Sequence, residues 1–444
     1  MNKPYPKYKP SGVEWLGDVP EHWSKFRISD LARYGKKTFI DGDWIESPYI
    51  TDDGVRLLQT GNVGIGKYKE QGYRYISEET FKELDCTEIN PGDVLICRLA
   101  DPVGRACIAP KLNERMITSV DVAILKLRPQ HLNKYIVYAL SSDQYLNYLA
   151  MLCRGGTRDR VSRSMLGQIR ISLPPLPEQQ AIAAFLDRET GRIDALIAKK
   201  ERLLELLAEQ RTALISRAVT KGLDASVKLK PSGVEWLGDV PEHWEVKKLK
   251  YVSNTNTGFA FSSDDYTDEG IPLIRIGDIL QDGNVDIANA KKLPEEYLRT
   301  YLFVAVNKND MLMAMTGATI GKAGRYQFDE KGLLNQRVCK FVPFKIFADF
   351  FWFILKSEQY AEHIKLTGFG GAQPNISDVQ LLDFHFALPP LPEQQDIAAF
   401  LDHETAKINA LSAKVTTVIE RLKEYRTALI SSAVTGKIDV REAV

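Results

Sequence analysis

The chain contains a long internal repeat, and this feature limits its fold more than any other. PSGVEWLGDVPEHW occurs at Pro10–Trp23 and again, without change, at Pro231–Trp244. LPPLPEQQ occurs at Leu173–Gln180 and again at Leu388–Gln395. Each half holds a variable body of about 150 residues between these segments, far longer than the 20–50-residue period of a solenoid. The sequence therefore predicts two copies of one large unit, related by a pseudo-twofold axis.

A heptad pattern follows each copy of LPPLPEQQ, and it predicts a helix of about 40 residues, or about 60 Å. The expected pairing positions are Leu186, Ile193, Leu196, Leu203, Leu207 and Leu214 in the first copy, and Leu401, Ile408, Leu411, Val415, Val418, Leu422 and Leu429 in the second. Gly222 and Gly436 follow, where helix ends are expected. Each apolar seam needs a partner, and the other copy is the nearest, so we expect an antiparallel coiled coil. The alternative is a long helix that packs on its own domain.

The variable bodies show short apolar alternations, turn signals such as NPGD at Asn90–Asp93, and one helical stretch before each terminal loop. The helical stretches are expected at Leu132–Leu149 and Ile346–Leu366. The predicted fold class is α+β, with two tandem mixed domains that are each followed by a long helix. We expect domains at residues 1–172 and 223–387, which include the repeat segments 10–23 and 231–244, and helices within residues 173–222 and 388–444.

Composition excludes several classes of protein. Lys plus Arg and Asp plus Glu both number 58, so nucleic-acid binding would require a local basic surface. The five cysteines form no C-x-x-C pair and the six histidines no metal-ligand spacing, which argues against a disulfide framework and a metal site. The longest apolar run, at residues 350–355, is too short to span a membrane. We expect a cytoplasmic protein without membrane contact.

No catalytic constellation is recognisable. TGATIGKAG, at Thr316–Gly324, departs from a phosphate-binding loop because three residues separate its glycines and Ala323 follows Lys322. His22 and His243 lie inside the repeated PEHW, where we expect a structural role beside tryptophan. We expect this chain to bind no cofactor or metal and to have no enzymatic activity of its own.

Polar loops at matched positions of the two halves are the candidate functional sites. RGGTRDRVSR, at residues 154–163, carries four arginines, and its counterpart TGFGGAQPNIS, at residues 367–377, carries amides instead. A second loop lies earlier in each half, at residues 98–105 and 316–322. Arginine can bind phosphate or guanine, and Gln or Asn can pair with adenine. The candidate DNA-binding residues are Arg98, Arg105, Arg154, Thr157, Arg158, Arg160, Ser162, Arg163, Arg275, Thr316, Thr319, Lys322, Gln373, Asn375 and Ser377.

The chain resembles the specificity subunits of type I restriction-modification systems over essentially its whole length. The doubled PSGVEWLGDVPEHW, the doubled LPPLPEQQ-x-x-IAAFLD and the loops GATIGK and GAQPNIS carry the resemblance. It implies that each variable body reads one half of a split site in double-stranded DNA, and that the paired helices set the distance between the half-sites. It also implies docking of two modification (methyltransferase) subunits and of restriction (translocase-nuclease) subunits. S-adenosylmethionine, ATP and Mg²⁺ would then bind to those partners.

The first half departs from the family pattern, because RLADPVGR stands in place of a GxxGK loop and RGGTRDRVS in place of GAQPNIS. Two other interpretations remain open at this point. The chain could be a helical scaffold whose variable domains bind proteins or non-DNA ligands. It could also be an enzyme with an unrecognised active site, although two diverged bodies without a shared catalytic constellation argue against this.

Overall fold

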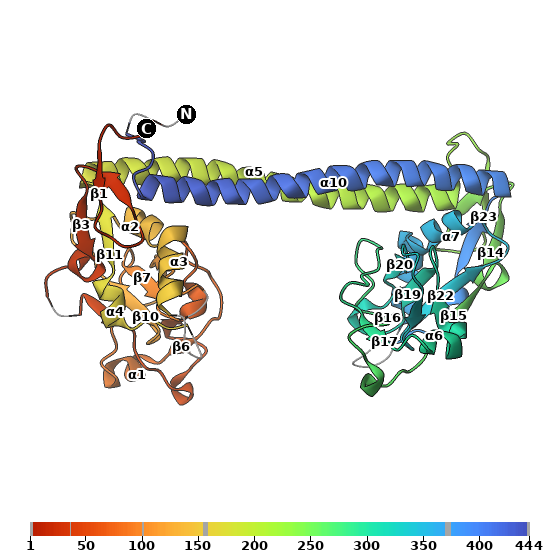
Figure 1. Cartoon of the computed structure of the whole chain (residues 1–444), viewed down its shortest axis with the longest axis horizontal. Helices are drawn as coiled ribbons and strands as arrows, with labels where there is room; N and C mark the ends of the chain where they lie inside the picture. The colour runs from red at the N-terminus through yellow and green to blue at the C-terminus, as the bar shows by residue number, and fades with distance from the viewer. Residues whose placement is uncertain (1–2, 36, 100–101, 154–158, 369–373, 442–444) are drawn as a thin grey trace. The chain divides into compact units, whose positions relative to one another are not determined.

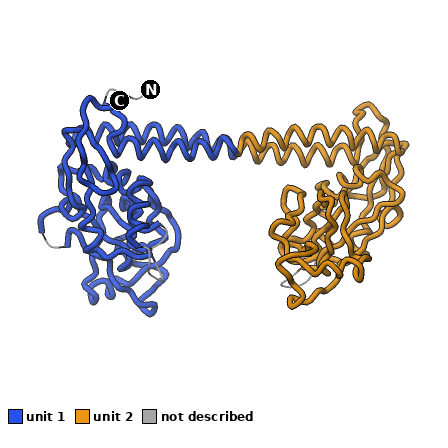
Figure 2. Tube along the Cα trace, viewed as in Figure 1, with its two compact units in different colours: residues 1–201, 417–444 blue, residues 202–416 orange. Residues whose placement is uncertain are grey.

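The computed structural model of the chain describes residues 3–35, 37–99, 102–153, 159–368 and 374–441. It divides into two compact units, of which unit 1 comprises residues 1–201 and 417–444 and unit 2 comprises residues 202–416 (Figure 2). Each unit holds one variable body together with a segment of each long helix. The division falls inside both helices, because each helix packs at its two ends on different neighbours. The domain limits expected from the sequence, at the starts and ends of the helices, are a different division and remain a prediction.

Unit 1 carries mixed secondary structure before its first long helix (Figure 1). Its elements are β1 (Tyr8–Pro10), β2 (Asp18–Pro20), β3 (Ser24–Arg27), β4 (Phe39–Asp41), β5 (Val55–Leu58), β6 (Tyr75–Ile76), α1 (Glu78–Glu83), β7 (Val94–Cys97), β8 (Ala106–Ile108), β9 (Met116–Thr118), β10 (Val122–Leu125), α2 (Asn133–Ala139), α3 (Asp143–Leu152), α4 (Arg163–Gln168), β11 (Arg170–Leu173) and the start of α5 (Leu176–Lys221).

Unit 2 repeats this order closely, which confirms the predicted α+β class and its tandem arrangement. Its elements are β12 (Leu229–Pro231), β13 (Asp239–Pro241), β14 (Glu245–Lys248), β15 (Ser253–Thr257), β16 (Ile271–Ile274), β17 (Lys291–Leu293), α6 (Tyr297–Thr300), β18 (Ala305–Val306), β19 (Met311–Ala314), β20 (Ala323–Arg325), β21 (Gly332–Leu334), β22 (Val338–Pro343), α7 (Ala348–Leu355), α8 (Glu358–Thr367), α9 (Asp378–Leu382), β23 (His385–Leu388) and the start of α10 (Leu391–Val434).

The same antiparallel sheet forms in both units. Its strand order is β4-β10-β7-β8 in unit 1 and β15-β22-β19-β20 in unit 2. Central strands β7 and β10 are buried along their whole length, as expected for the continuous apolar sequences VLIC and VAIL. A second, mixed sheet has the order β6-β5-β9 in unit 1 and β17-β16-β21-β18 in unit 2.

The repeated segments fasten each long helix to its domain. In unit 1, Glu178 lies in the first turn of α5 and is buried. Its carboxylate accepts hydrogen bonds from the Tyr5 hydroxyl at 2.7 Å and from Trp23 Nε1 at 2.9 Å, and His22 Nε2 lies 2.6 Å from it. His22 and Trp23 of the repeated PEHW therefore form one polar cluster with Glu178 of the repeated LPEQQ. This cluster supports the structural role expected for His22.

The second copy repeats this cluster with fewer partners. Glu393 accepts a hydrogen bond from Trp244 Nε1 at 3.0 Å and lies 2.8 Å from His243 Nε2. Each helix is followed by a glycine with a left-handed backbone, Gly222 at φ 73° and Gly436 at φ 72°, as the sequence predicts. A Cβ on Gly222 would lie 3.2 Å from the Trp244 ring, so the helix end and the repeated tryptophan are packed closely.

The two long helices pack together and run antiparallel in each unit, which confirms the predicted helix pair (Figure 1). In unit 1, Arg426 Nε of α10 lies 2.8 Å from Asp194 Oδ1 of α5. In unit 2, Ile215 and Leu401 belong to one buried cluster. Most of the predicted pairing residues at the seven-residue spacing are buried, namely Leu186, Ile193, Leu207, Leu401, Val415 and Leu429. The others at this spacing are half-buried, namely Leu214, Ile408 and Leu422.

The register of the intervening seam position was predicted wrongly by one residue. Leu196, Leu411 and Val418 are 41%, 45% and 40% exposed, and Leu203 is only half-buried. Along both helices the more buried of the two intervening positions lies four residues, not three, after each heptad position, except that Leu203 and Leu204 are both half-buried. This position is occupied by Thr190, Ile197, Leu204, Arg211 and Ala218 in α5, and by Thr405, Ser412, Ile419, Arg426 and Ala433 in α10.

Each predicted helical stretch before a terminal loop is two helices rather than one. The breaks occur at Ser142, before α3, and at Ser357, before α8. Ser357 accepts a hydrogen bond from Tyr360 N at 3.3 Å, so its side chain caps the second helix. The apolar period alone does not reveal such a cap, and this is why the stretch seemed continuous.

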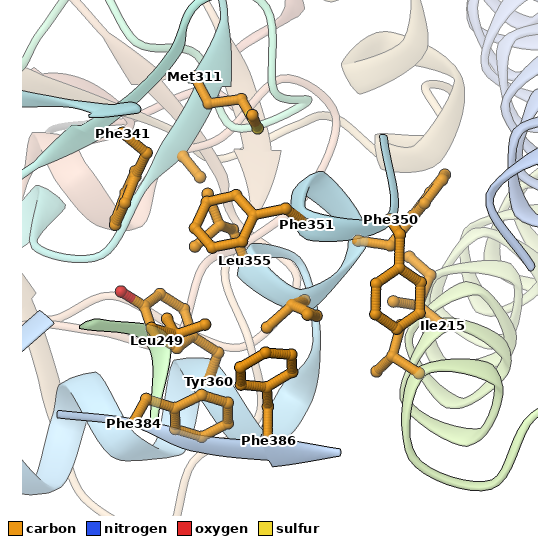
Figure 3. Packing of buried hydrophobic residues seen from close by; sticks show 14 of the residues in the cluster. Ile215, Leu249, Met311, Phe341, Phe350, Phe351, Leu355, Tyr360, Phe384 and Phe386 are labelled. Carbon is orange, nitrogen blue, oxygen red and sulfur yellow. The ribbon is translucent and has the colours of Figure 1, made fainter. Parts of the chain in front are cut away.

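The largest buried cluster of unit 2 joins its domain to its helix pair. Phe350 and Phe351 of α7 are fully buried and pack with Tyr360, Phe384 and Ile215 (Figure 3). Because Ile215 belongs to α5, this core fixes the domain on the helices. Within the described residues, no helix has the length and apolar character needed to cross a membrane.

Candidate nucleic-acid interface

Corresponding loops converge at one edge of the antiparallel sheet in each unit. In unit 1, β7 ends and β10 begins at this edge, where Cys97 pairs with Val122. In unit 2, Ala314 at the end of β19 pairs with Val338 at the start of β22. Because neighbouring antiparallel strands end and begin together, the loops that follow β7 and β19 leave from equivalent places.

A short β-bridge joins the two candidate loops in each unit. Leu99 pairs with Arg160 in unit 1, and Thr316 pairs with Asn375 in unit 2. These contacts join segments about 60 residues apart in the sequence. The structure therefore brings together the two loops that the sequence singled out separately, and the unit 2 loops carry hydroxyl and amide side chains where those of unit 1 carry guanidinium groups.

The Thr316 loop is held by main-chain hydrogen bonds. Gly317 N donates to Pro374 O at 2.9 Å, and Ile376 N donates to Met315 O at 3.0 Å. Thr319 Oγ1 donates to the main-chain oxygen of Thr316, so this hydroxyl stabilises the turn. Asn375 is exposed. Thr316 Oγ1 is buried and has no hydrogen-bond partner among the residues described.

Lys322 and Arg275 lie at different places around this region of unit 2. Lys322 is half-buried and lines a cavity of about 230 Å³ with Lys356, whose pKa falls to about 8 because of burial and the nearby Arg211 guanidinium. Arg275 follows the end of β16 and lies 3.5 Å from Asp278 through Nε. Its neighbour Ile274 accepts a hydrogen bond from Asn335 N at 3.0 Å, which places the start of this turn beside the sheet edge.

Arg98 and Arg105 are not available for DNA contact, which corrects the prediction for both. Arg98 is 4% exposed, donates to the main-chain oxygens of Val161 and Val120, and forms an ion pair with Asp41 at 2.9 Å. Arg105 is 8% exposed. It donates to four main-chain oxygens, those of Thr60, Val63, Leu99 and Pro102. Buried guanidinium groups with this many partners hold loops together.

Arg160 and Arg163 remain at the surface of unit 1. Arg160 forms an ion pair with Asp121, with 2.8 Å between Nη2 and Oδ1, and its side chain is 52% exposed. Arg163 donates to Phe39 O at 2.9 Å and lies 3.4 Å from Asp41. Both guanidinium groups are positioned by a neighbour and still reach solvent, so both keep an edge that could meet DNA.

Ser162 and Ser377 have a structural role that the sequence did not indicate. Ser162 Oγ accepts a hydrogen bond from Met165 N at 3.1 Å and caps α4. Ser377 Oγ accepts one from Gln380 N at 3.3 Å and caps α9. Arg154, Thr157, Arg158 and Gln373 lie outside the described residues.

Sequence reasoning missed a third segment at this edge, residues 119–121 in unit 1 and 335–337 in unit 2. Gln336 and Arg337 are exposed there. These residues stand directly before a central apolar strand in both halves, a matched position that an alignment of the two halves could have shown. Among the described residues, no three His, Cys, Asp or Glu side chains gather in a way that could hold a metal ion.

Comparison with known proteins places this chain in a family. The model of the type I restriction modification DNA specificity domain matches residues 20–206 and 241–421. The chain belongs to this family. Each of the two matches covers one variable body and extends into the helix that follows it, so this member of the type I specificity family carries the domain twice.

Relatives in the type I specificity family align along nearly the whole chain. The MjaVIII specificity subunit of Methanocaldococcus jannaschii is 27% identical over 95% of this chain and 94% of its own length. The EcoKI specificity subunit of Escherichia coli is 21% identical over 95% of this chain and 90% of its own length.

Two solved structures share the fold. A chain from a structure that describes complex assembly and conformational transition of the type I R-M system superposes with a TM-score of 0.71 at 16% identity, covering 94% of this chain and 98% of its own. The HsdS subunit of Thermoanaerobacter tengcongensis has a TM-score of 0.50 at 17% identity, covering 95% and 98%.

Proposed function

We propose that this chain is the sequence-specific DNA-recognition subunit of a type I restriction-modification complex. It reads an asymmetric bipartite site, with one domain for each half-site. The observation that carries the proposal is the convergence of two candidate loops at the same sheet edge of each unit, with arginine in one unit and amide and hydroxyl side chains in the other. Two similar folds with different edge chemistry would read two different half-sites.

In this proposal the chain has no catalytic activity of its own, and its partner subunits carry out the reactions. Two modification subunits would bind S-adenosylmethionine and methylate adenine, and restriction subunits would use ATP and Mg²⁺. The net charge of zero supports this division, because the chain lacks the overall basic field that draws DNA to many free-standing DNA-binding proteins. The helix pair would serve as the spacer between the half-sites.

The proposal is tested by expressing the chain with its modification subunits in a host without adenine methylation, followed by long-read methylation mapping. We expect methylated adenines within one bipartite motif whose two halves differ. The same modification subunits expressed alone are the control and should leave the motif unmethylated. Methylated adenines that share no sequence motif would contradict the proposal, and so would a single continuous motif without a gap. Either result would favour a scaffold that binds other ligands.

A further inference from the structure

A third segment meets the two candidate loops at the sheet edge, and it occupies the same place in each unit. In unit 1 it ends at Asp121, directly before β10, and in unit 2 it ends at Arg337, directly before β22. Arg98 N donates to Asp121 O at 2.8 Å, and Met315 N donates to Arg337 O at 2.9 Å. Asp121 and Arg337 are therefore equivalent, and each is fixed by its main chain beside the loop that leaves the central strand.

The bridged residues on the other candidate loop complete the comparison. Arg160 and Asn375 occupy matched places, since each pairs with the first loop of its own unit. The edge thus carries the pair Asp121 and Arg160 in unit 1, and the pair Arg337 and Asn375 in unit 2. In unit 1 the cation is Arg160, on the later candidate loop. In unit 2 it is Arg337, on the segment before β22.

The surroundings of the two arginines differ. Arg160 is paired with the Asp121 carboxylate. Arg337 is exposed, and within the described part of the chain its guanidinium has no ion pair or hydrogen bond. The edge of unit 2 therefore retains unused hydrogen-bonding capacity at a fixed position.

We propose that Arg337 reads a guanine of the second half-site in the major groove, with Asn375 beside it at the neighbouring base pair. This inference rests on the proposed DNA-recognition function. Arginine presents a planar fork of donors that matches the O6 and N7 acceptors of guanine, while Asn matches N6 and N7 of adenine. Arg160, oriented by its ion pair with Asp121, reads the first half-site in the same way. The two half-sites differ because unit 1 presents Asp121 and Arg160 where unit 2 presents Arg337 and Asn375.

The test uses the complex with its modification subunits and a set of DNA duplexes in which each base pair of the mapped motif is changed in turn. Arg337→Ala should weaken binding of the intact site by about ten- to hundredfold, the range for loss of a bidentate base contact. It should also abolish discrimination at one G·C pair of the second half-site. Arg337→Lys keeps the charge but not the fork, so discrimination at that pair should remain lost.

Two control variants make the result specific. Lys331→Ala removes an exposed cation at the opposite end of β21 and should leave binding and discrimination unchanged. Arg160→Ala should relax choice in the first half-site only. Because Arg337 is exposed and has no side-chain partner among the described residues, its removal should leave the melting temperature of the chain unchanged.

Two outcomes would overturn the inference while the proposed function stands. In the first, Arg337→Ala keeps the full preference of the parent complex at every base pair. In the second, it weakens all duplexes equally and lowers the salt dependence, which would identify a phosphate contact. If the unmodified chain itself specifies no bipartite motif, the proposed function fails and the role of Arg337 fails with it.

Discussion

At the scale of single residues, the cluster around Glu178 differs from its repeat around Glu393 in a way that can be measured. Glu178→Ala would leave two buried donors, the Tyr5 hydroxyl and Trp23 Nε1, without an acceptor. Unsatisfied buried donors cost about 1–3 kcal/mol each, so we expect a loss of about 3 kcal/mol. Glu393→Ala removes fewer partners and a carboxylate that is itself more accessible to water, since the Glu393 side chain is 31% exposed, and should cost about 1 kcal/mol.

Urea unfolding followed by tryptophan fluorescence would measure this difference, with Glu178→Gln as the control that retains an amide oxygen as acceptor. Equal losses for the two alanine variants would show that burial and the Tyr5 contact add nothing at the first copy. The identical letters of the repeats could not reveal this asymmetry, because Tyr5 lies outside the duplicated segment.

Other residues show how far the sequence can specify a DNA-binding site. The two loops of each half were found from their composition, and the structure joins them by a β-bridge. The sequence does not distinguish Arg98 and Arg105 from the exposed arginines. Arg98 is occupied by Asp41 and by two main-chain oxygens. Arg105 donates to main-chain oxygens that include those of Thr60 and Val63, about 40 residues away. A local pattern cannot show which distant carbonyl groups will surround a guanidinium. Arg337 is the counterpart of Asp121, and only a comparison of the two halves at the position directly before the central strand indicates it.

At the scale of elements, the heptad period predicted both long helices and their pairing, but not the full register. The second seam position includes Thr190 and Arg211 in α5, and such residues do not stand out as apolar. Thr190 satisfies its hydroxyl by donating to Leu186 O at 2.6 Å, which allows a polar residue to lie in the seam. The neighbouring Leu196 was predicted as a pairing residue because it is apolar, although the structure shows that it is exposed.

The corrected register is testable with two adjacent isomeric residues. Ile197 is 9% exposed and Leu196 is 41% exposed, so alanine removes the same number of atoms from a buried and from an exposed place. Ile197→Ala should lower the free energy of unfolding by about 2–3 kcal/mol, and Leu196→Ala by less than about 1 kcal/mol. Denaturant unfolding monitored by circular dichroism checks both, and a larger loss for Leu196→Ala would restore the register first predicted.

At the scale of the whole molecule, the proposed spacer role makes a prediction about the DNA site rather than about the protein. Because the helices run antiparallel, a shorter spacer requires matched deletions, one heptad from 197–203 in α5 and its equivalent, 412–418, in α10. Seven residues correspond to about 10 Å of helix, or about three base pairs at 3.4 Å each. A whole heptad preserves the seam, whereas a deletion of five residues would turn the apolar face away from its partner.

We therefore expect the heptad-deleted chain, expressed with its modification subunits, to methylate the same two half-sites at a shorter separation, the gap closing by up to about three base pairs. The five-residue deletion is the control and should abolish methylation through loss of helix pairing. Long-read methylation mapping reads both results directly. An unchanged gap in the heptad variant would mean that the separation is fixed by the partner subunits or the domains, and that the helix pair only joins the two units.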